Sequence, residues 1–372
     1  MKASIIAALL LVGMLQNAAS VLAQTSTSRS IVARKKKAKK KSRVKPAPPV
    51  DPTEGDNVDG DDLEIRRAAV SAIGTMNGSV LVADPSNGRV LTIVNQKLAL
   101  KSGFIPCSTI KLVTALAALN EHLVTRTERV PIARRVSYTL TDALAHSNNQ
   151  YFGVLGTRLG FDRVEHYAQM LGLGDKAGLD IAGEQAGAIP SEPPRGGGMG
   201  MMTAYGEGFL LTPLELASLL SAIANGGTLY YLQYPRTPEE LESFTPKVKR
   251  TLDFSPSDLE DVKAGMRGAV DFGTARRAND PNDPILGKTG TCTDFPTANH
   301  MGWFGSFNEV AHHQLVVVVM LAGTRTFNGP VAAGVAGTVY RTLSEERYFA
   351  TDTTARKDGD LPEILTTYSA SR

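Results

Sequence analysis

A serine and a lysine three residues apart are the first pair in this sequence whose types and spacing suit chemistry. Ser108 and Lys111 lie near the start of the run F-I-P-C-S-T-I-K-L-V-T-A-L-A-A-L-N-E-H-L, residues 104–123. The run is apolar and unbroken after its proline, which predicts a mostly buried helix beginning near Cys107. Side chains three positions apart share a helix face. A hydroxyl beside an amine in apolar surroundings suits nucleophilic catalysis by serine, because the alcohol attacks only when a base takes its proton.

Two further short motifs follow in a fixed order. On its own, the S-x-x-K pair is better explained by a helix cap followed by a lysine that reaches the surface. Ser147-Asn148-Asn149 is S-x-N at a break between two helical patterns, and Lys288-Thr289-Gly290 is K-T-G within a strand pattern. The succession S-x-x-K, S-x-N and K-T-G is specific where each motif alone is weak.

The surrounding sequence predicts the elements that would position these motifs. Strands are expected over 78–95 (a hairpin), 285–293, 300–307 and 314–322, and helices over 140–159, 163–171, 212–224, 257–272 and 330–345. Residues 183–205 are rich in Gly and Pro, which predicts a long loop. Strands at both ends with helices between them predict an α+β fold, in which a mostly antiparallel sheet is flanked by helices and joined to a helical lobe.

The first 23 residues have the layout of a secretory signal peptide. Lys2 precedes an apolar core over 5–15, and V-L-A ends at Ala23. We therefore expect an exported protein, periplasmic or otherwise extracytoplasmic, with an uncleaved membrane anchor as the alternative. The apolar run is short for a span, which needs about 20 apolar residues.

Residues 24–65 are expected to be a disordered linker, first basic and then rich in Pro and acids. The basic part suits an anionic membrane surface or wall polymer, and a solvated tether is the alternative. Nucleic acid is not an expected partner, because the export signal argues against it. One folded domain is then predicted over 66–350, followed by a poorly ordered tail over 351–372.

The chain contains only two cysteines, Cys107 and Cys292. Two cysteines exclude a disulfide-rich scaffold and a cysteine-rich metal site. Neither a metal nor a cofactor is expected from the sequence.

With these motifs the chain resembles the penicillin-binding transpeptidases, from about residue 78 to 346. The runs V-A-D-P-S-N-G-R-V-L, Y-G-E-G-x-x-L-T-P-L-E-L-A, G-M-R-G-A-V-D-F-G-T-A and W-F-G-S-F match as well. The resemblance implies the fold shared by penicillin-binding transpeptidases and serine β-lactamases. It also implies acyl transfer through an acyl-serine on the D-Ala-D-Ala stem peptides of peptidoglycan, with β-lactams as covalent inhibitors.

The resemblance assigns a role to each motif residue. Ser108 is the nucleophile, Lys111 its base, and Ser147 the relay that carries the proton to the leaving amine. Burial and a nearby positive charge would lower the pKa of Lys111, as a base at neutral pH requires. Asn149 is expected to hydrogen-bond the substrate's backbone amide.

The K-T-G strand is expected to bind the other end of the substrate. Lys288 supplies a positive field, while the hydroxyls of Thr289 and Thr291 suit a terminal carboxylate. Gly290 is expected to let the substrate lie against the strand. The backbone N–H groups of Ser108 and Thr291 would form the oxyanion hole.

The resemblance also implies a disulfide between Cys107 and Cys292. Each cysteine is next to one oxyanion-hole residue, and some carbapenem-hydrolysing β-lactamases of this superfamily have a disulfide at these two motif positions. An exported protein meets an oxidising compartment, which permits the bond. Two buried free thiols are the alternative.

Three departures keep other activities open. The stretch between Lys111 and Ser147 is short for the family, neither a glycosyltransferase region nor a folded N-terminal pedestal is expected, and Glu207 stands where Gln is commoner. A reduced groove would favour D,D-carboxypeptidase hydrolysis. A serine β-lactamase is the closest rival enzyme, but no E-x-x-L-N loop occurs between Asn149 and Lys288. A β-lactam receptor is the non-enzymatic alternative.

Overall fold

The computed structural model describes residues 50–294, 297–310 and 313–350. The predicted signal peptide (1–23), linker residues 24–49 and the predicted tail (351–372) lie outside the described residues. Among the described helices, none combines the length and the apolar character that crossing a membrane requires.

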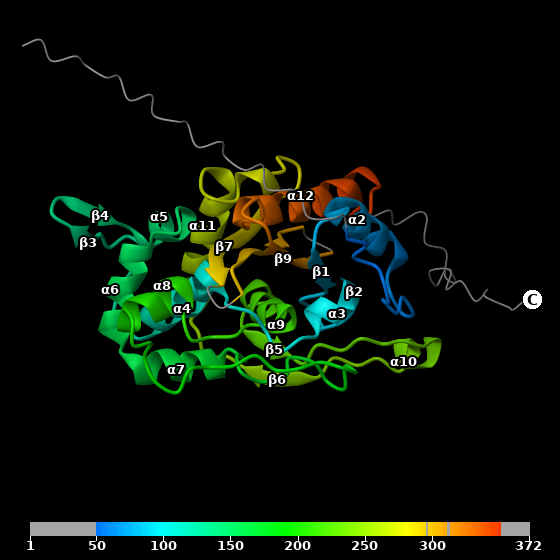
Figure 1. The fold of residues 1–372 in the computed structure, drawn as a ribbon, viewed down its shortest axis with the longest axis horizontal. Coiled ribbons are helices and arrows are strands. Elements are labelled where there is room, and N and C mark those ends of the chain that lie inside the picture. Colours follow the sequence, from blue (N-terminus) through cyan, green and yellow to red (C-terminus); the bar gives the residue numbers. More distant parts are fainter. Residues whose placement is uncertain (1–49, 295–296, 311–312, 351–372) are drawn as a thin grey trace, which may run out of the picture. The chain divides into compact units, whose positions relative to one another are not determined.

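A five-stranded sheet forms the centre of the fold (Figure 1). Its strands are β1 (Gly78–Ala83), β2 (Val90–Val94), β7 (Ile285–Asp294), β8 (Asn299–Asn308) and β9 (Val316–Gly323), in the order β2-β1-β9-β8-β7. Every neighbouring pair is antiparallel. Residues of β1, β2 and β9 are buried almost without alternation, which means that both faces of the sheet are covered.

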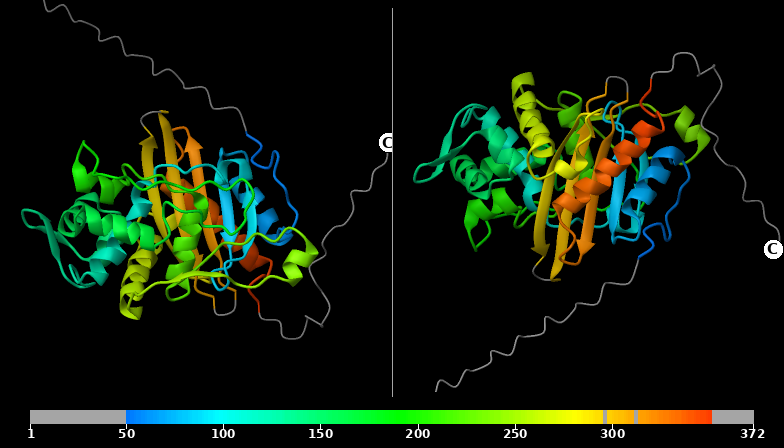
Figure 2. Two further views of the ribbon diagram at one scale, coloured as in Figure 1. Left: turned by 90° about the horizontal axis from the view of Figure 1, so that it is seen from below. Right: turned by 90° about the horizontal axis from the view of Figure 1, so that it is seen from above.

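Two helices from the ends of the domain cover one face. Helices α2 (Leu63–Ile73) and α12 (Gly329–Glu345) lie side by side over the sheet (Figure 2). Their apolar side chains, among them Ile73 and Tyr340, pack on the sheet residues of this face. The termini of the domain are thereby attached to the same layer.

The opposite face carries helix α9 (Pro213–Ala224), all of whose residues are buried. The sequence starts this helix with a capping box, in which the Thr212 hydroxyl accepts from the Glu215 N–H and the Glu215 carboxylate accepts from the Thr212 N–H. Pro213 occupies the first helical position, where its restricted φ suits a helix and its missing N–H leaves no hydrogen bond unmade.

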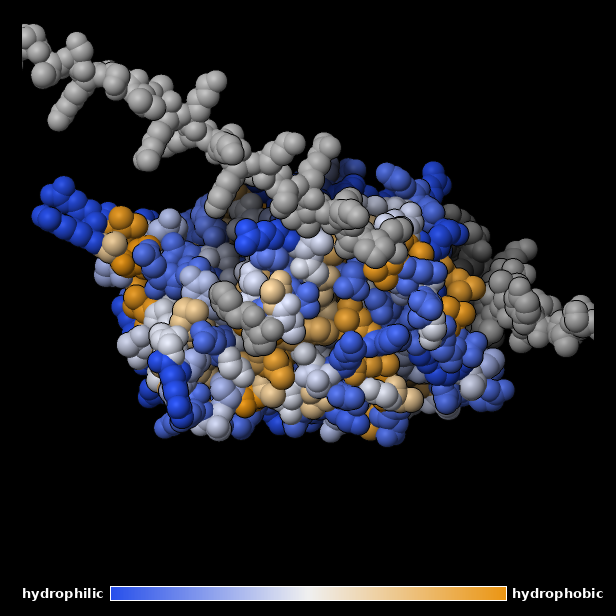
Figure 3. Space-filling view, viewed as in Figure 1, coloured by the Kyte–Doolittle hydropathy of each residue, from blue (hydrophilic) through white to orange (hydrophobic). Residues whose placement is uncertain are grey.

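A helical lobe adjoins the sheet beyond β7 (Figure 1). It contains η1 (Cys107–Ile110), α4 (Lys111–Asn120), α5 (Leu140–Ala145), α6 (Asn149–Leu159), α7 (Phe161–Met170), α8 (Gly198–Tyr205) and α11 (Pro256–Asp271). The smaller elements are α3 (Gln96–Ala99), β3 (Val130–Ala133), β4 (Val136–Tyr138), β5 (Thr228–Tyr230), α10 (Pro238–Glu242), β6 (Val248–Thr251) and η2 (Arg276–Ala278). The β3–β4 hairpin projects from the lobe with a hydrophilic tip (Figures 1 and 3), where Arg134 and Arg135 are exposed.

The predicted α+β architecture, the hairpin over 78–95, the three C-terminal strands and the helices named from the sequence are confirmed, with boundaries shifted by a few residues. The loop predicted over 183–205 is wrong at its end, because residues 198–205 form helix α8. Glycines flank this helix. Gly197 precedes it and Gly206 follows it, both with left-handed φ (100° and 72°), so the glycines mark its ends rather than exclude it.

The disordered linker predicted over 24–65 extends too far. Helix α2 begins at Leu63, where the Asp62 carboxylate caps it by accepting from the N–H groups of Glu64 and Ile65. The acidic residues before it are also bound to the domain: Asp56 and Asp61 both pair with Arg66. Charge composition alone suggested a solvated segment, but two of these carboxylates have a buried guanidinium partner.

Candidate active site

Ser108 lies in the single turn of 3-10 helix that leads into α4. The turn η1 begins at Cys107, whose φ of 53° is unusual for a residue with a side chain. Ser147, in the break between α5 and α6, has a similar φ of 54°. Such backbone strain is maintained only where the surrounding structure enforces it, and it concentrates at functional sites. Ser108 itself is 9% exposed.

Lys111 is the centre of the hydrogen-bond network at this site. Its side chain is fully buried. The Nζ atom lies 2.8 Å from Ser108 Oγ, 2.6 Å from Asn149 Oδ1, and 3.0 and 3.1 Å from the backbone oxygen and Oγ of Ser147. The structure therefore brings the S-x-x-K and S-x-N motifs together around one amine.

Lys288 joins this network from strand β7. Its fully buried Nζ donates to Ser147 Oγ and to the Thr289 backbone oxygen, both at 2.9 Å. Ser147 Oγ thus lies between the two lysine amines. A proton can pass along Ser108, Lys111 and Ser147 without leaving hydrogen-bond contact.

Neither lysine has a carboxylate partner among the described residues. Burial lowers the pKa of Lys288 to about 7. Burial, together with the charge of Lys288, lowers the pKa of Lys111 to about 6. An ordinary lysine has a pKa of about 10.4, so at neutral pH the Lys111 amine is largely unprotonated and can accept a proton.

The partners of Lys111 determine where its lone pair points. The backbone oxygen of Ser147 and Oδ1 of Asn149 can only accept, so each takes one N–H of the neutral amine. The lone pair is then left for a hydroxyl, and Ser108 Oγ at 2.8 Å is the nearer of the two available. The geometry therefore directs the Lys111 lone pair toward the Ser108 hydroxyl.

The K-T-G residues lie on β7 beside η1, on two faces. The Thr289 hydroxyl hydrogen-bonds with the Thr274 hydroxyl at 2.6 Å, and Thr291 Oγ1 accepts from the N–H of Gly329 at the start of α12. Gly290 faces the other way. A Cβ there would lie 3.0 Å from the Pro106 oxygen.

The predicted reason for glycine at position 290 is wrong, because Gly290 faces η1 and Trp303 at close range. We predicted that the missing side chain leaves room for substrate. The space is already filled, since a Cβ would also approach Thr109 Cγ2 to 3.2 Å and Trp303 Cβ to 3.1 Å. The absence of a side chain instead lets β7 and η1 approach closely enough to build the site.

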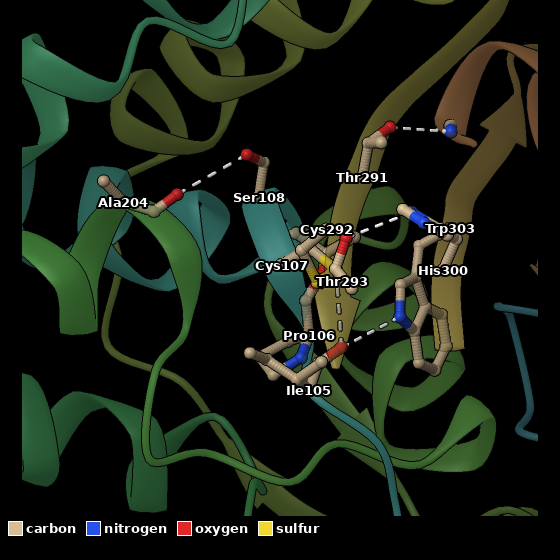
Figure 4. The surroundings of a disulfide bond; sticks show 12 residues. Ile105, Pro106, Cys107, Ser108, Ala204, Thr291, Cys292, Thr293, His300 and Trp303 are labelled. Atoms are coloured by element: carbon tan, nitrogen blue, oxygen red, sulfur yellow. Dashed lines mark hydrogen bonds between the residues drawn. A yellow bond between two sulfur atoms is a disulfide. The ribbon is translucent and has the colours of Figure 1, made fainter. Parts of the chain in front are cut away.

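A disulfide bond joins Cys107 to Cys292, with the Cα atoms 5.5 Å apart (Figure 4). It connects the residue before Ser108 to the residue after Thr291. The indole N–H of Trp303 on β8 donates to the Ile105 oxygen at 3.0 Å and supports the same junction. The two proposed oxyanion-hole residues are therefore attached to a covalently linked frame.

Three residues at the site carried no assignment from the sequence. The Ala204 oxygen lies 3.4 Å from Ser108 Oγ (Figure 4), the Tyr205 hydroxyl accepts from Asn149 Nδ2 at 2.7 Å, and Thr274 pairs with Thr289. Tyr205 opens the run Y-G-E-G, Ala204 directly precedes it, and Thr274 lies in the run F-G-T-A. The sequence therefore identified these segments as similar to the family but did not show which of their atoms face the site.

No group of three or more His, Cys, Asp or Glu side chains that could hold a metal ion occurs in the described part of the chain. The side chains gathered at the site are hydroxyls, amines and one amide. This set suits proton transfer and acyl chemistry on a serine.

Comparison with known proteins agrees with this geometry. Residues 78–341 match the family described as the penicillin binding protein transpeptidase domain. Stage V sporulation protein D of Bacillus subtilis is 28% identical over 315 residues, covering 71% of this chain and 49% of that protein. Penicillin-binding protein H of the same organism is 33% identical over 153 residues, covering 38% of this chain and 21% of that protein. The chain thus spans about half or less of the length of these two relatives.

Solved structures show the same fold. The transpeptidase domain of penicillin-binding protein 3 from Burkholderia pseudomallei superposes with a TM-score of 0.67 at 21% identity, covering 77% of this chain and 96% of that one. PBP2 of Pseudomonas aeruginosa, in complex with WCK 5153, gives 0.64 at 25% identity and covers 77% and 74%. The match over residues 78–341 takes in the three motifs and most of the domain, and the chain belongs to the family of penicillin-binding protein transpeptidase domains.

Proposed function

We propose that this protein is a peptidoglycan D,D-transpeptidase that forms an acyl-enzyme at Ser108 with D-Ala-D-Ala stem peptides and is inactivated there by β-lactams. The observation that carries the proposal is the buried Lys111 amine, which has no carboxylate partner among the described residues and lies 2.8 Å from Ser108 Oγ. Among the relatives, a protein of Haemophilus influenzae named peptidoglycan D,D-transpeptidase MrdA is 23% identical over 345 residues and supports the same activity.

The acylation step uses the proton path from Ser108 through Lys111 to Ser147. Lys111 takes the proton of Ser108 as Oγ attacks the carbonyl of the penultimate D-alanine. The C–N bond then breaks, and the proton on Lys111 passes through Ser147 Oγ to the leaving D-alanine amine. An acceptor amine next attacks the ester carbonyl and gives up a proton, and Ser108 regains its own.

Substrate contacts follow from the arrangement of β7. The N–H groups of Ser108 and Thr291 are proposed to hold the oxyanion, since the disulfide frame keeps their segments adjacent. Donors of this kind contribute a few kcal/mol each to transition-state stabilisation. For the terminal carboxylate, the hydroxyls of Thr289 and Thr291 are proposed. That of Thr289 hydrogen-bonds with the Thr274 hydroxyl, and that of Thr291 accepts from the Gly329 N–H.

Hydrolysis of the acyl-enzyme is proposed to be slow. Within the residues that the structure describes, no carboxylate is hydrogen-bonded to Ser108 or Lys111, so no acidic base is in place for water. This favours a transpeptidase over a serine β-lactamase. D,D-carboxypeptidase activity is the second candidate, since the stretch between Lys111 and Ser147 that shapes the rim of the groove is short.

The location of the protein is part of the same proposal. Peptidoglycan lies outside the cytoplasm, and the signal-like residues 1–23 fit export. The basic residues of the linker are proposed to associate with an anionic membrane surface or wall polymer. N-terminal sequencing of the native protein should begin near residue 24; an intact Met1 in the membrane fraction would indicate an anchor instead.

A fluorescent penicillin tests the proposed activity. The wild-type protein should form one adduct, mapped by peptide analysis to Ser108, that persists for many minutes. Ser108→Ala should abolish it, whereas Ser218→Ala, which alters a buried serine on α9, should not. An adduct on another serine, or none, would contradict the proposal.

Three outcomes separate the candidate activities. Turnover of penicillin at about one per second or faster, within the ordinary range of enzymes, would indicate a β-lactamase. Release of D-alanine from a stem pentapeptide without cross-linking would indicate a carboxypeptidase. Formation of a cross-linked product with a second stem peptide indicates a transpeptidase.

A further inference from the structure

Tyr205 contacts the catalytic centre although neither the motifs nor the mechanism above uses it. It is the last residue of α8, and its hydroxyl oxygen lies 2.7 Å from Asn149 Nδ2. The preceding residue, Ala204, places its backbone oxygen 3.4 Å from Ser108 Oγ. The last turn of α8 thus contacts both the nucleophile and the amide of the S-x-N motif.

Helix α8 is held firmly against α6, which carries Asn149. A Cβ built on Gly153 would lie 3.6 Å from the Gly200 Cα, so the two helices meet at glycines. Thr203 Oγ1 lies 2.7 Å from the Met199 oxygen of its own helix and 3.0 Å from the Phe152 oxygen of α6. A Cβ on Gly156 would collide with the Thr203 side chain. Because this contact leaves no free space, the position of Tyr205 relative to Asn149 is fixed by backbone packing.

The Asn149 amide has a different task at each of its ends. Its Oδ1 accepts from Lys111 Nζ at 2.6 Å, and its Nδ2 donates one N–H to Tyr205. The second N–H of Nδ2 has no partner among the described residues and remains available for a carbonyl of the acyl donor. If the amide turned over, Nδ2 would face Lys111 and donate into the lone pair that the base needs.

We propose that Tyr205 is a positioning residue for acyl transfer, whose hydroxyl holds the Asn149 amide with Oδ1 on Lys111 and the remaining N–H toward the acyl donor. The role rests on the proposed function, since it concerns the acylation of Ser108. It adds a residue outside the three motifs, supplied by helix α8, whose sequence predicted a loop.

The groups that face Lys111 define what a change at Tyr205 would alter. Lys288 on β7 is the charged group acting on Lys111, and the other neighbours are the hydroxyls of Ser108 and Ser147, the Asn149 amide and the Phe152 ring at 5.7 Å. An Oδ1 dipole directed at Nζ stabilises the ammonium form. A turned amide would present N–H groups to the ammonium and lower the pKa of Lys111 further.

The substitution Tyr205→Phe tests this role, with Tyr151→Phe as a matched control. Tyr151 is buried on α6, two residues after Asn149, and its hydroxyl has no hydrogen-bond partner in the described structure. Both variants lose one phenolic oxygen, but only that of Tyr205 is hydrogen-bonded to Asn149. Acylation of Ser108 by fluorescent penicillin is followed from pH 5 to 9, along with the melting temperature.

Tyr205→Phe should lower the acylation rate constant about three- to tenfold, the effect expected from one hydrogen bond. The acid limb of its pH profile should move to lower pH, because the carbonyl dipole no longer supports the ammonium. Tyr151→Phe should leave both rate and pH profile unchanged. The shift of the limb is the decisive reading, since lost packing alone would not move it.

Two results would overturn the inference. One is an unchanged rate and pH profile in Tyr205→Phe. The other is a rate loss that accompanies a fall in melting temperature with the acid limb unmoved, which would assign Tyr205 a structural role only. Both apply when the wild-type protein is acylated at Ser108; a wild type that is not acylated contradicts the proposed function itself.

Discussion

Two clusters of buried charge in this molecule are built on opposite rules. Near the start of the domain, Arg66 pairs with Asp56 at 2.8 Å and Asp61 at 2.9 Å, and all three side chains are at most 10% exposed. At the candidate active site, Lys111 and Lys288 are fully buried, and neither has a carboxylate partner among the described residues. We call the first cluster compensated, because each buried charge there faces an opposite charge. The second is uncompensated, because its two amines face no carboxylate among the described residues.

The difference shows in the pKa values. Burial alone would lower the pKa of Arg66, but hydrogen bonds and charges from Asp56 and Asp61 outweigh it and raise the pKa. Burial is not opposed by any carboxylate at Lys111 and Lys288, whose pKa values fall to about 6 and about 7. A compensated charge stays ionised and stabilises structure, whereas an uncompensated amine gives up its proton and becomes a base.

The compensated cluster also reaches beyond the ion pairs. Tyr234 hydrogen-bonds to Asp61 Oδ1, and the Arg236 guanidinium stacks 3.5 Å from the centre of the Tyr234 ring. Burial raises the pKa of Asp61, and the hydrogen bonds from Tyr234, Thr92 and Arg66 oppose that rise. These contacts attach the segment before α2 to residues far along the chain.

Removing the uncompensated amine should have the largest effect. Lys111→Met is expected to slow acylation of Ser108 by about 10²- to 10⁴-fold, the usual contribution of a general base. Lys97→Met, at an exposed lysine on α3, is the control. Stopped-flow or quenched labelling with penicillin measures the rate, and a loss smaller than tenfold would mean that Lys111 is not the base.

Opening the disulfide tests how the catalytic cluster is attached to the sheet. The bond spans a sequence separation of 185 residues, for which chain entropy predicts up to about 5 kcal/mol of stability. The Cys107→Ser/Cys292→Ser double variant should therefore unfold at lower urea and acylate more slowly. Thiol counting under denaturing, non-reducing conditions should find no free thiol in oxidised wild type; two free thiols would refute the bond.

Breaking the compensated cluster should affect stability without affecting chemistry. Arg66→Met leaves two buried carboxylates without their cation and should cost roughly 3–5 kcal/mol of unfolding free energy. Arg67→Met breaks a pair with Glu346 whose arginine side chain is 64% exposed, and should change the unfolding free energy far less, because solvent screens the pair. Urea denaturation measures both. The acylation rate per folded molecule should stay at the wild-type value, and a drop in Arg66→Met would invalidate the contrast.

The pH dependence of stability should reveal the buried amines. Between the folded pKa values near 6 and 7 and the ordinary value near 10.4, the unfolded lysines bind protons that the folded ones do not. Unfolding free energy should therefore rise with pH in this window, by up to about 1.4 kcal/mol per pH unit for each lysine. Lys288→Met should flatten the slope by one lysine, and an unchanged slope would show that Lys288 is charged when folded.

The sequence predicted those features that are local or that motifs mark. The apolar run after Pro106 predicted the buried helix that carries Ser108 and Lys111, and the K-T-G motif identified a strand of the sheet. Helix α8 was missed because its Gly-rich composition becomes helical only through close packing on α6. The reason for Gly290 was misjudged because strand alternation does not tell which face meets η1.

The contacts between buried charges and partners far along the chain also could not be predicted from the sequence. The acidic stretch before Leu63 has the composition of a solvated segment. Its order depends on Asp61 meeting Tyr234, 173 positions away, and on the Asp56 carboxylate accepting from the N–H groups of Asn95 and Gln96. Composition cannot show which charges will find such partners.

The pH dependence of Ser108 acylation in the wild-type protein tests the central claim most directly. If the uncompensated Lys111 amine is the base, the rate constant should rise with an apparent pKa between about 6 and 7, which belongs to the coupled Lys111–Lys288 pair, and should be near its plateau at neutral pH. A limb near pH 10, the value of an ordinary lysine, or a profile without an acid limb would contradict the account.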